Sequence, residues 1–200
     1  MKKTALILSG ILLTVFLAFS QAYAQSLPSI PSEPDTVRTV GENQPDKTTG
    51  GRIHSFAEGY SLEIPDGFTT GESKKDECRY SNPDDDADLD FMVFEIPPGE
   101  NGSEESLKKL REIIYNDISS FIPGYRKEEE KDIQLNNMKG FLIRASAEGE
   151  SSDKVTDEMS ICLSENRKHV FILHLVYPAE LKEKYGSYSE NILKTVRKSN

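Results

Sequence analysis

The segment VFILHLVY, residues 170–177, constrains the fold most, because its apolar residues occupy both alternating faces of one extended stretch. Successive side chains of a strand point to opposite faces of its sheet. A strand that is apolar on both faces is therefore expected in the middle of a sheet that is covered on both sides. Residues 90–96 show the same two-sided pattern, and Pro178 and Pro97 end the two segments.

Weaker strand patterns surround these two segments. Residues 60–64 alternate and stop at a Pro-Asp-Gly turn, and residues 75–81 are a weaker candidate. Three further strands are predicted before the strand that contains residues 170–177, over residues 125–135, 140–147 and 155–164. Asn136-Asn137 and Glu165-Asn166 supply short turns between these segments. Short connections favour antiparallel neighbours, so a meander is expected.

Two amphipathic helices complete the pattern. Ser103 is a good N-cap, and the stripe that follows it predicts a helix ending at Pro123-Gly124. A second stripe predicts a helix over about residues 179–197. The fold class is therefore predicted as α+β: a mostly antiparallel sheet of about six or seven strands with amphipathic helices packed on it.

The first 24 residues read as a secretory signal peptide. Lys2 and Lys3 precede a nearly uninterrupted apolar run, and Ala22-Tyr23-Ala24 places small residues at the expected cleavage site. The alternative is a membrane anchor, but the run is only about 15 residues, short of the roughly 20 that span a bilayer. We expect residues 1–24 to be removed and the protein to be exported, periplasmic or secreted, with no transmembrane anchor after cleavage.

Residues 25–52 contain four prolines, three glycines and few large apolar side chains, so they are predicted to be a flexible tether. Residues 53–200 are predicted to be a single domain. Loss of Lys2 and Lys3 changes the net charge from −10 to −12. Such an acidic chain is repelled by nucleic acid phosphates and anionic membrane surfaces, so neither is expected as a partner.

Cys78 and Cys162 are the two cysteines of the chain. In an oxidising compartment two cysteines in one domain are more often a disulfide than a reactive site, so a Cys78–Cys162 bond is expected. The alternative is that the two are distant and unpaired, because bonding requires Cα atoms roughly 4.4–6.8 Å apart.

The sequence offers little catalytic or metal-binding chemistry. It has no G-x-S-x-G elbow and no phosphate-binding glycine loop, and His54, His169 and His174 are scattered. Two distant cysteines and three such histidines do not make a zinc site. We therefore predict no catalytic residue, no cofactor and no enzyme activity.

One acidic segment resembles the start of a calcium loop. Asp84, Asp86 and Asp88 place oxygens at alternate positions, but Leu89 stands where the loop needs glycine, and Glu95 in the twelfth position belongs to a predicted strand. The simpler interpretation of Asp84–Asp90 is a solvated acidic turn, and no metal ligand is predicted.

The order of these motifs resembles that of PsbP-like domains. Residues 56–68, FAEGYSLEIPDGF, resemble the opening strand of that family. Over roughly residues 55–198 the resemblance continues through Phe91 to the Ser103 helix, Gly124-Tyr125, Gly140 and the strand at residues 170–177. The family includes the photosystem II extrinsic protein, a Ran-binding Mog-type protein and DcrB-like envelope proteins. The resemblance implies an α/β/α sandwich that acts as a binding or assembly factor, generally without catalysis.

The leading functional hypothesis is an exported binding or assembly module of the bacterial cell envelope, with another envelope or secreted protein as its partner. Three alternatives stay open. One is a carrier of a small apolar or lipid-like ligand between sheet and helix, which the nine Phe and eight Tyr residues permit. The others are a calcium-responsive module and an enzyme.

Overall fold

The structure is a computed structural model that describes residues 52–56, 59–73, 76–96, 102–122, 124–148 and 153–198. The predicted signal peptide and residues 25–51 of the predicted tether lie outside the described residues. Arg52, expected to be the last tether residue, is the first residue of strand β1 (Arg52–Ser55).

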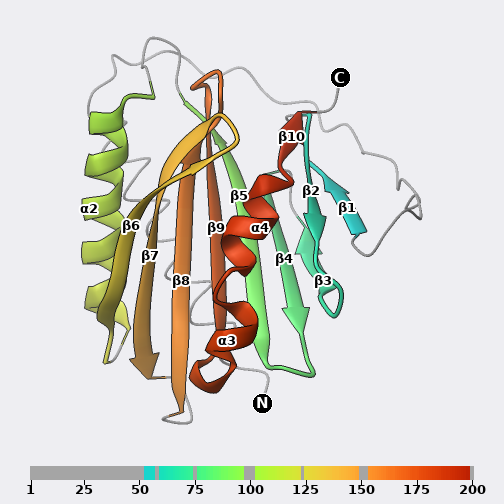
Figure 1. The fold of residues 1–200 in the computed structure, drawn as a ribbon, viewed down its shortest axis with the longest axis vertical. Coiled ribbons are helices and arrows are strands. Elements are labelled where there is room, and N and C mark those ends of the chain that lie inside the picture. The colour runs from blue at the N-terminus through green and yellow to red at the C-terminus, as the bar shows by residue number, and fades with distance from the viewer. Residues whose placement is uncertain are drawn as a thin grey trace, which may run out of the picture.

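Within the described residues, seven strands form one antiparallel sheet in the order β3-β4-β5-β9-β8-β7-β6 (Figure 1). These strands are β3 (Thr69–Ser73), β4 (Glu77–Asn82), β5 (Ala87–Glu95), β6 (Arg126–Leu135), β7 (Met138–Glu148), β8 (Lys154–Leu163) and β9 (His169–Pro178). β5 and β9 pair in the middle of the sheet, as the two-sided patterns predict. The meander from β6 to β9 is also confirmed.

The side chains of β9 explain its central place. Phe171, Leu173 and Leu175 belong to the hydrophobic core on one face of the sheet, whereas Val170 and Ile172 belong to the core on the other face. Both faces are therefore covered, as a strand without a polar face requires.

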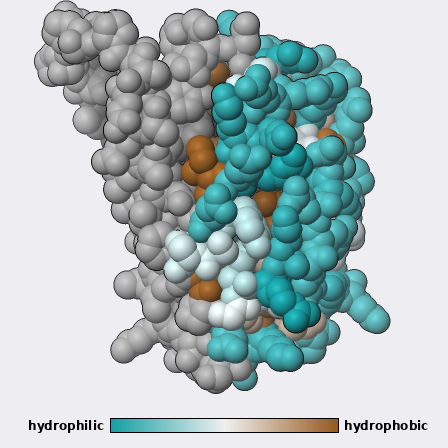
Figure 2. Space-filling model, turned by 90° about the vertical axis from the view of Figure 1, so that its left-hand side faces the viewer, coloured by the Kyte–Doolittle hydropathy of each residue, from teal (hydrophilic) through white to brown (hydrophobic). Residues whose placement is uncertain are grey.

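Helix α2 (Glu104–Phe121) covers one face. Ser103 caps it, because the Ser103 hydroxyl accepts a hydrogen bond from the backbone N–H of Ser106 at 3.0 Å. The helix packs its apolar stripe on the sheet through Leu107, Leu110, Ile114 and Ile118. The side of the molecule that carries α2 and β6 is mostly hydrophilic, with a few hydrophobic atoms showing between the polar ones (Figure 2).

The opposite face is covered by the C-terminal segment and a small sheet. β2 (Tyr60–Ile64) lies between β1 and β10 (Arg197–Lys198) in a second sheet, which has three strands within the described residues. The C-terminal segment consists of a 3-10 turn η1 (Ala179–Leu181) and two short helices, α3 (Lys182–Tyr185) and α4 (Tyr188–Lys194).

Two details of the prediction are wrong. The expected helix over residues 179–197 is divided, because α3 ends at Gly186, a poor helix former, and the chain leaves α4 for β10. The strand at residues 60–64 lies in the small sheet, and β3, which was not predicted, forms the edge of the large one. The α+β class and the helices on a mostly antiparallel sheet are confirmed. None of the described helices is long and apolar enough to cross a membrane.

The expected disulfide is absent. Cys78 on β4 and Cys162 on β8 are both buried, and no disulfide joins them. β5 and β9 lie between their strands, so three strand spacings place them about 14 Å apart. That separation is about twice what a disulfide can bridge, so the prediction of a Cys78–Cys162 bond is corrected.

Candidate functional site

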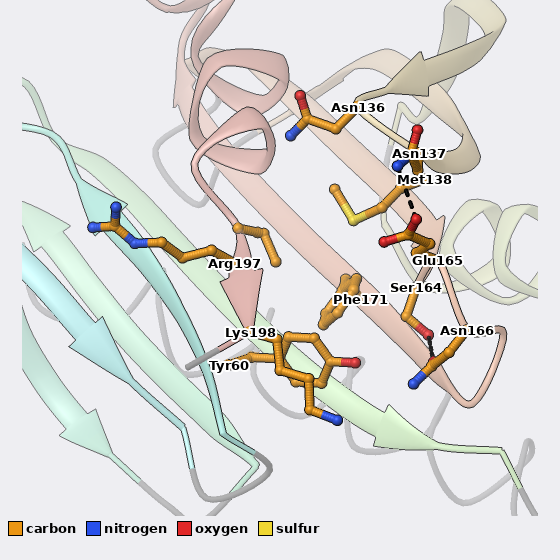
Figure 3. Close-up of a pocket in the computed structure, with 11 residues that line it drawn as sticks. Tyr60, Asn136, Asn137, Met138, Ser164, Glu165, Asn166, Phe171, Arg197 and Lys198 are labelled. Atoms are coloured by element: carbon orange, nitrogen blue, oxygen red, sulfur yellow. Dashed lines mark hydrogen bonds between the residues drawn. The ribbon is translucent and has the colours of Figure 1, made fainter. Parts of the chain in front are cut away.

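A cleft of about 300 Å³ lies at the end of the molecule where the β6–β7 turn, the β8–β9 turn and β10 meet (Figures 1 and 3). We call it the terminal cleft. It is lined by Tyr60, Asn136, Asn137, Met138, Ser164, Glu165, Asn166, Phe171, Val196, Arg197 and Lys198. The two turns share this end because β6–β7 and β8–β9 are alternate hairpins of one antiparallel meander, with the β7–β8 connection at the other end.

The floor of the terminal cleft is apolar and fixed. Tyr60, Met138 and Phe171 are buried. The Tyr60 ring meets the Phe171 ring edge to face at a centroid distance of 4.9 Å. Its hydroxyl lies 3.2 Å from Nδ1 of His169, also a buried residue. Tyr60 therefore has one defined orientation at the base of the cleft.

The rim that the β6–β7 turn contributes is held by two amides. Asn136 adopts a left-handed φ of 55°, a conformation that asparagine tolerates, and donates through Nδ2 to the carbonyl of Lys194 at 3.0 Å. Asn137 donates through Nδ2 to Glu165 at 2.8 Å. These bonds tie the turn to the end of α4 and to the neighbouring turn.

The β8–β9 turn is closed by its own side chains. The Ser164 hydroxyl donates to Oδ1 of Asn166 at 2.8 Å and accepts from the backbone N–H of His169 at 2.9 Å. The Asn166 Oδ1 atom also accepts from the backbone N–H of Lys168 at 3.0 Å. The polar rim is therefore organised before any ligand arrives, which lowers the entropy cost of binding.

Three charged residues line the cleft. Arg197 points away from it and lies 3.5 Å from Glu63 in an exposed ion pair (Figure 3). Lys198 crosses the face of Tyr60, with Nζ 5.8 Å from the ring centroid. Glu165 is the remaining charge, so the lining has two cations and one anion in a chain of net charge −10.

This arrangement is suited to binding rather than to chemical conversion. Amide and hydroxyl groups donate and accept hydrogen bonds but do not exchange protons readily near neutral pH. A serine nucleophile needs a neighbouring base. The hydroxyl of Ser164 instead bonds to the amide of Asn166 and to a backbone N–H.

Neither His174 nor His54 lines the terminal cleft, and both are held in other parts of the fold. His174 contacts Asp157 at 3.1 Å, and both side chains are at most 4% exposed, so a substrate cannot reach them. Burial lowers the pKa of His174, but the carboxylates of Asp157, Asp90 and Asp88 raise it more, and the result lies above the usual value. This pair is a buried charge cluster of the sheet.

His54 lies beside Cys78, with Nε2 3.0 Å from Sγ. Its ring also packs on Phe56 and Tyr80. Burial lowers the pKa of His54. Since Cys78 is fully buried, the pair is part of the core beneath β1.

The acidic segment Asp84–Asp90 does not converge on one point. Asp85 accepts hydrogen bonds from the Tyr185 hydroxyl at 2.5 Å and from the Lys184 ammonium. Asp90 instead bonds to Nε of Arg79 at 2.8 Å, from the sheet face that carries His174. Among the residues that the structure describes, no three His, Cys, Asp or Glu side chains come together as a metal site would require.

Sequence reasoning missed the terminal cleft. The Asn136-Asn137 and Glu165-Asn166 pairs were predicted only as turns, and Lys198 carried no signal. One available clue was that both turns are rich in asparagine and fall at the same end of a predicted meander.

No protein-family model matches the sequence, and no curated protein matches it either. Solved structures do match. Cyanobacterial PsbP (CyanoP) from Synechocystis sp. PCC 6803 aligns with a TM-score of 0.58 at 12% identity, covering 80% of this chain and 98% of that one. The fold is that of the PsbP-like proteins.

Two other solved structures support the PsbP-like fold. The Saccharomyces cerevisiae Ran-binding protein Mog1p aligns with a TM-score of 0.51 at 9% identity, covering 76% of this chain and 97% of that one. LpqN, involved in cell envelope biogenesis of Mycobacterium tuberculosis, aligns with a TM-score of 0.51 at 12% identity, covering 70% of this chain and 83% of that one. The resemblance to PsbP-like domains is therefore confirmed for the fold, which does not define a function by itself.

Proposed function

We propose that this chain is an exported, non-catalytic binding module of the bacterial cell envelope, and that it contacts a protein partner through the terminal cleft. The observation that carries the proposal is the preorganised rim of the cleft over a fixed apolar floor. Asn137, Ser164 and Asn166 are held by hydrogen bonds within and between the two turns, while Tyr60 is held by His169. Such a site presents defined donors and acceptors without an activated nucleophile.

The structural relatives and the N-terminal sequence support the same proposal. Mog1p is a Ran-binding protein, and LpqN is involved in cell envelope biogenesis. The charged, apolar and small-residue order of residues 1–24 favours export. A binding role in the envelope agrees with all three observations.

In-cell photo-crosslinking tests the proposal. A photoreactive benzoylphenylalanine at exposed Asn137 on the rim should capture one reproducible envelope protein. The same group at exposed Glu183, on α3 at the other end of the molecule, is the matched control and should not (Figure 1). Equal capture from Asn137 and Glu183, or no capture from Asn137 under native expression, would contradict the proposal.

A second function, carriage of a small ligand, is favoured by the volume of the cleft. About 300 Å³ is at the lower end of the range for small-molecule sites. Native mass spectrometry of the protein purified without denaturation should then show a bound mass that decreases in a Lys198→Ala variant. An empty protein in every preparation would exclude the carrier and leave the protein-binding proposal standing.

A further inference from the structure

A groove of about 520 Å³ lies between α2 and the end of β6, against the sheet face opposite α3 and α4. We call it the helix–edge groove. Its lining comprises Glu104, Leu107, Lys108, Arg111, Asp132, Ile133, Gln134, Lys139, Gly140 and Phe141. Leu107 and Phe141 are buried and belong to the core beneath α2, so the groove has an apolar base.

β6 is the terminal strand of the large sheet, so one of its edges has no neighbouring strand among the described residues. The two-residue turn places Leu135 opposite Met138 as a hydrogen-bonded pair. Because hydrogen-bonded and non-hydrogen-bonded pairs alternate, Ile133 also bonds to β7, while Gln134 and Asp132 direct their backbone N–H and C=O groups outward.

The first part of this edge is protected against strand pairing. Residues 126–132 are all charged, and the register shifts between Lys127 and Glu129, which marks a bulge. The protection stops after Asp132, because Ile133, Gln134 and Leu135 are uncharged. The unprotected part of the edge is the part that borders the helix–edge groove.

The charges of the groove favour an acidic occupant. Arg111 pairs with Asp132 at 3.2 Å, and Lys139 pairs with Glu104 at 2.7 Å. Lys108 is exposed and has no ion-pair partner among the described residues. The groove therefore keeps one uncompensated cation in a protein of net charge −10.

We propose that residues 132–135 accept an extended peptide as an additional strand of the sheet, with an apolar side chain in the helix–edge groove and an acidic side chain near Lys108. Main-chain hydrogen bonds to Gln134 and Asp132 supply affinity in this mode, and the groove supplies side-chain selection. Alternate side chains of an added strand point to the same face, so every second residue of the peptide enters or borders the groove. This surface is separate from the terminal cleft and goes beyond the function proposed for it.

Two synthetic peptides test the proposal by NMR: Ac-Val-Thr-Glu-Thr-Val-NH2, in which both Val side chains and the Glu side chain fall on one face of the strand, and the same peptide with Lys in place of Glu. The glutamate peptide should shift the amide signals of residues 132–135 and slow hydrogen exchange at Gln134, and it should bind more tightly than the lysine peptide. Absence of any shift at residues 132–135 with either peptide at millimolar concentration would overturn the proposal. So would equal affinity for the two peptides, because the Lys108 argument would then fail.

A pair of variants separates backbone pairing from side-chain contact. Gln134→Pro removes the outward N–H without removing a bond to β7, and proline is tolerated on edge strands. It should weaken binding about tenfold, whereas Gln134→Ala keeps the N–H and should bind the glutamate peptide as the unmodified protein does. Unchanged amide signals in β8 and β9 verify that each variant folds. If Gln134→Pro bound the glutamate peptide as tightly as the unmodified protein does, strand addition would be contradicted. Amide shifts confined to residues 164–166 would also contradict strand addition, but they would leave the terminal cleft proposal intact.

Discussion

The guanidinium of Arg144 on β7 lies 2.6 Å from Oε2 of Glu158 on β8, in an ion pair that is almost wholly buried beneath the C-terminal helices. The same guanidinium donates to the carbonyl of Gly186 at 2.8 Å and pairs with Glu129 on β6. Gly186 stands between α3 and α4. One side chain therefore connects three strands of the sheet to the link between the two helices that cover it.

Arg144→Met should destabilise the protein by about 3–5 kcal/mol, because it leaves Glu158 buried without its counter-charge. Burial already raises the pKa of Glu158 more than Arg144 lowers it. The double variant Arg144→Met/Glu158→Met should recover most of the loss, since a buried ion pair can often be replaced by apolar side chains. Urea unfolding of both variants measures this. A loss below about 1 kcal/mol for the single variant would mean that solvent reaches Glu158.

His174 should make stability decrease as the pH rises. Its pKa is above the usual 6.5 in the folded protein, so the folded state holds the proton more tightly than the unfolded state. The stabilisation is complete below pH 6.5 and is lost as the pH rises through the folded-state pKa. The acids that face His174 are Asp157 on β8 and Asp88 and Asp90 on β5.

Melting curves from about pH 5.5 to about pH 9 test this. The difference in melting temperature between the unmodified protein and His174→Gln should shrink as the pH rises. His54→Gln is the matched control, because burial lowers the pKa of His54 and its contribution has the opposite pH dependence. Parallel curves for the unmodified protein and His174→Gln would show that His174 does not titrate differently on folding.

The large sheet could be predicted because its signals are local. The apolar residues on both faces of residues 170–177 indicate a buried strand, and Ser103 indicates where a helix begins. Both signals come from residues that are close together in the sequence. β3 could not be found in this way, because the segment TTGES has no apolar alternation and its strand character comes from pairing with β4. The small sheet was missed for a similar reason: the alternation of residues 60–64 shows that one face is buried but not which sheet provides the pairing.

The terminal cleft and the cysteine separation depend on topology, which periodicity does not encode. Lys198 becomes a neighbour of Tyr60 only when β10 returns to pair with β2, and Tyr60 meets Phe171 only when β2 packs on the large sheet. Cys78 and Cys162 are kept apart because β5 and β9 insert between their strands. The order of strands in space, rather than along the chain, decides both results.

Both cysteines should react as thiols, and only after unfolding. Cys78 and Cys162 are fully buried, so a reagent cannot reach either sulfur in the folded protein. Burial also raises the pKa of Cys162 to about 12, so this thiol forms little thiolate. Ellman's reagent should detect two thiols in denaturant and almost none under native conditions. A protein purified under non-reducing conditions whose mass is two hydrogens lower would show instead that a disulfide had formed.

Millimolar calcium should leave the melting temperature unchanged. Among the described residues no three carboxylates come together as a calcium site would require. Two acids of the segment are engaged elsewhere, Asp85 by Lys184 and Tyr185 and Asp90 by Arg79. A ligand that binds the folded state stabilises it in proportion to the logarithm of its concentration over its dissociation constant. Thermal unfolding with about 5 mM calcium chloride measures this, and magnesium controls for ionic strength. A rise with calcium alone would restore the calcium-responsive hypothesis.

Gly140 should be the glycine least able to accept a side chain. A Cβ atom there would lie 2.0 Å from the carbonyl oxygen of Ile161 and 2.6 Å from Sγ of Cys162, and both belong to the neighbouring strand β8. Gly140→Ala should therefore destabilise the protein by at least about 3 kcal/mol, or prevent folding, because β7 and β8 would have to separate in the middle of the sheet. Gly71→Ala is the control on edge strand β3, where the nearest atom is 3.3 Å away and the expected loss is below about 1 kcal/mol.

A second variant identifies which contact prevents substitution at Gly140. Cys162→Ala removes the sulfur but leaves the carbonyl of Ile161 in place, so adding it to Gly140→Ala should not restore stability. The measurement is the urea midpoint of the double variant relative to Cys162→Ala alone. If the double variant were as stable as Cys162→Ala, the sulfur would be the only obstacle, and the two strands could not be as close at this position as the structure places them.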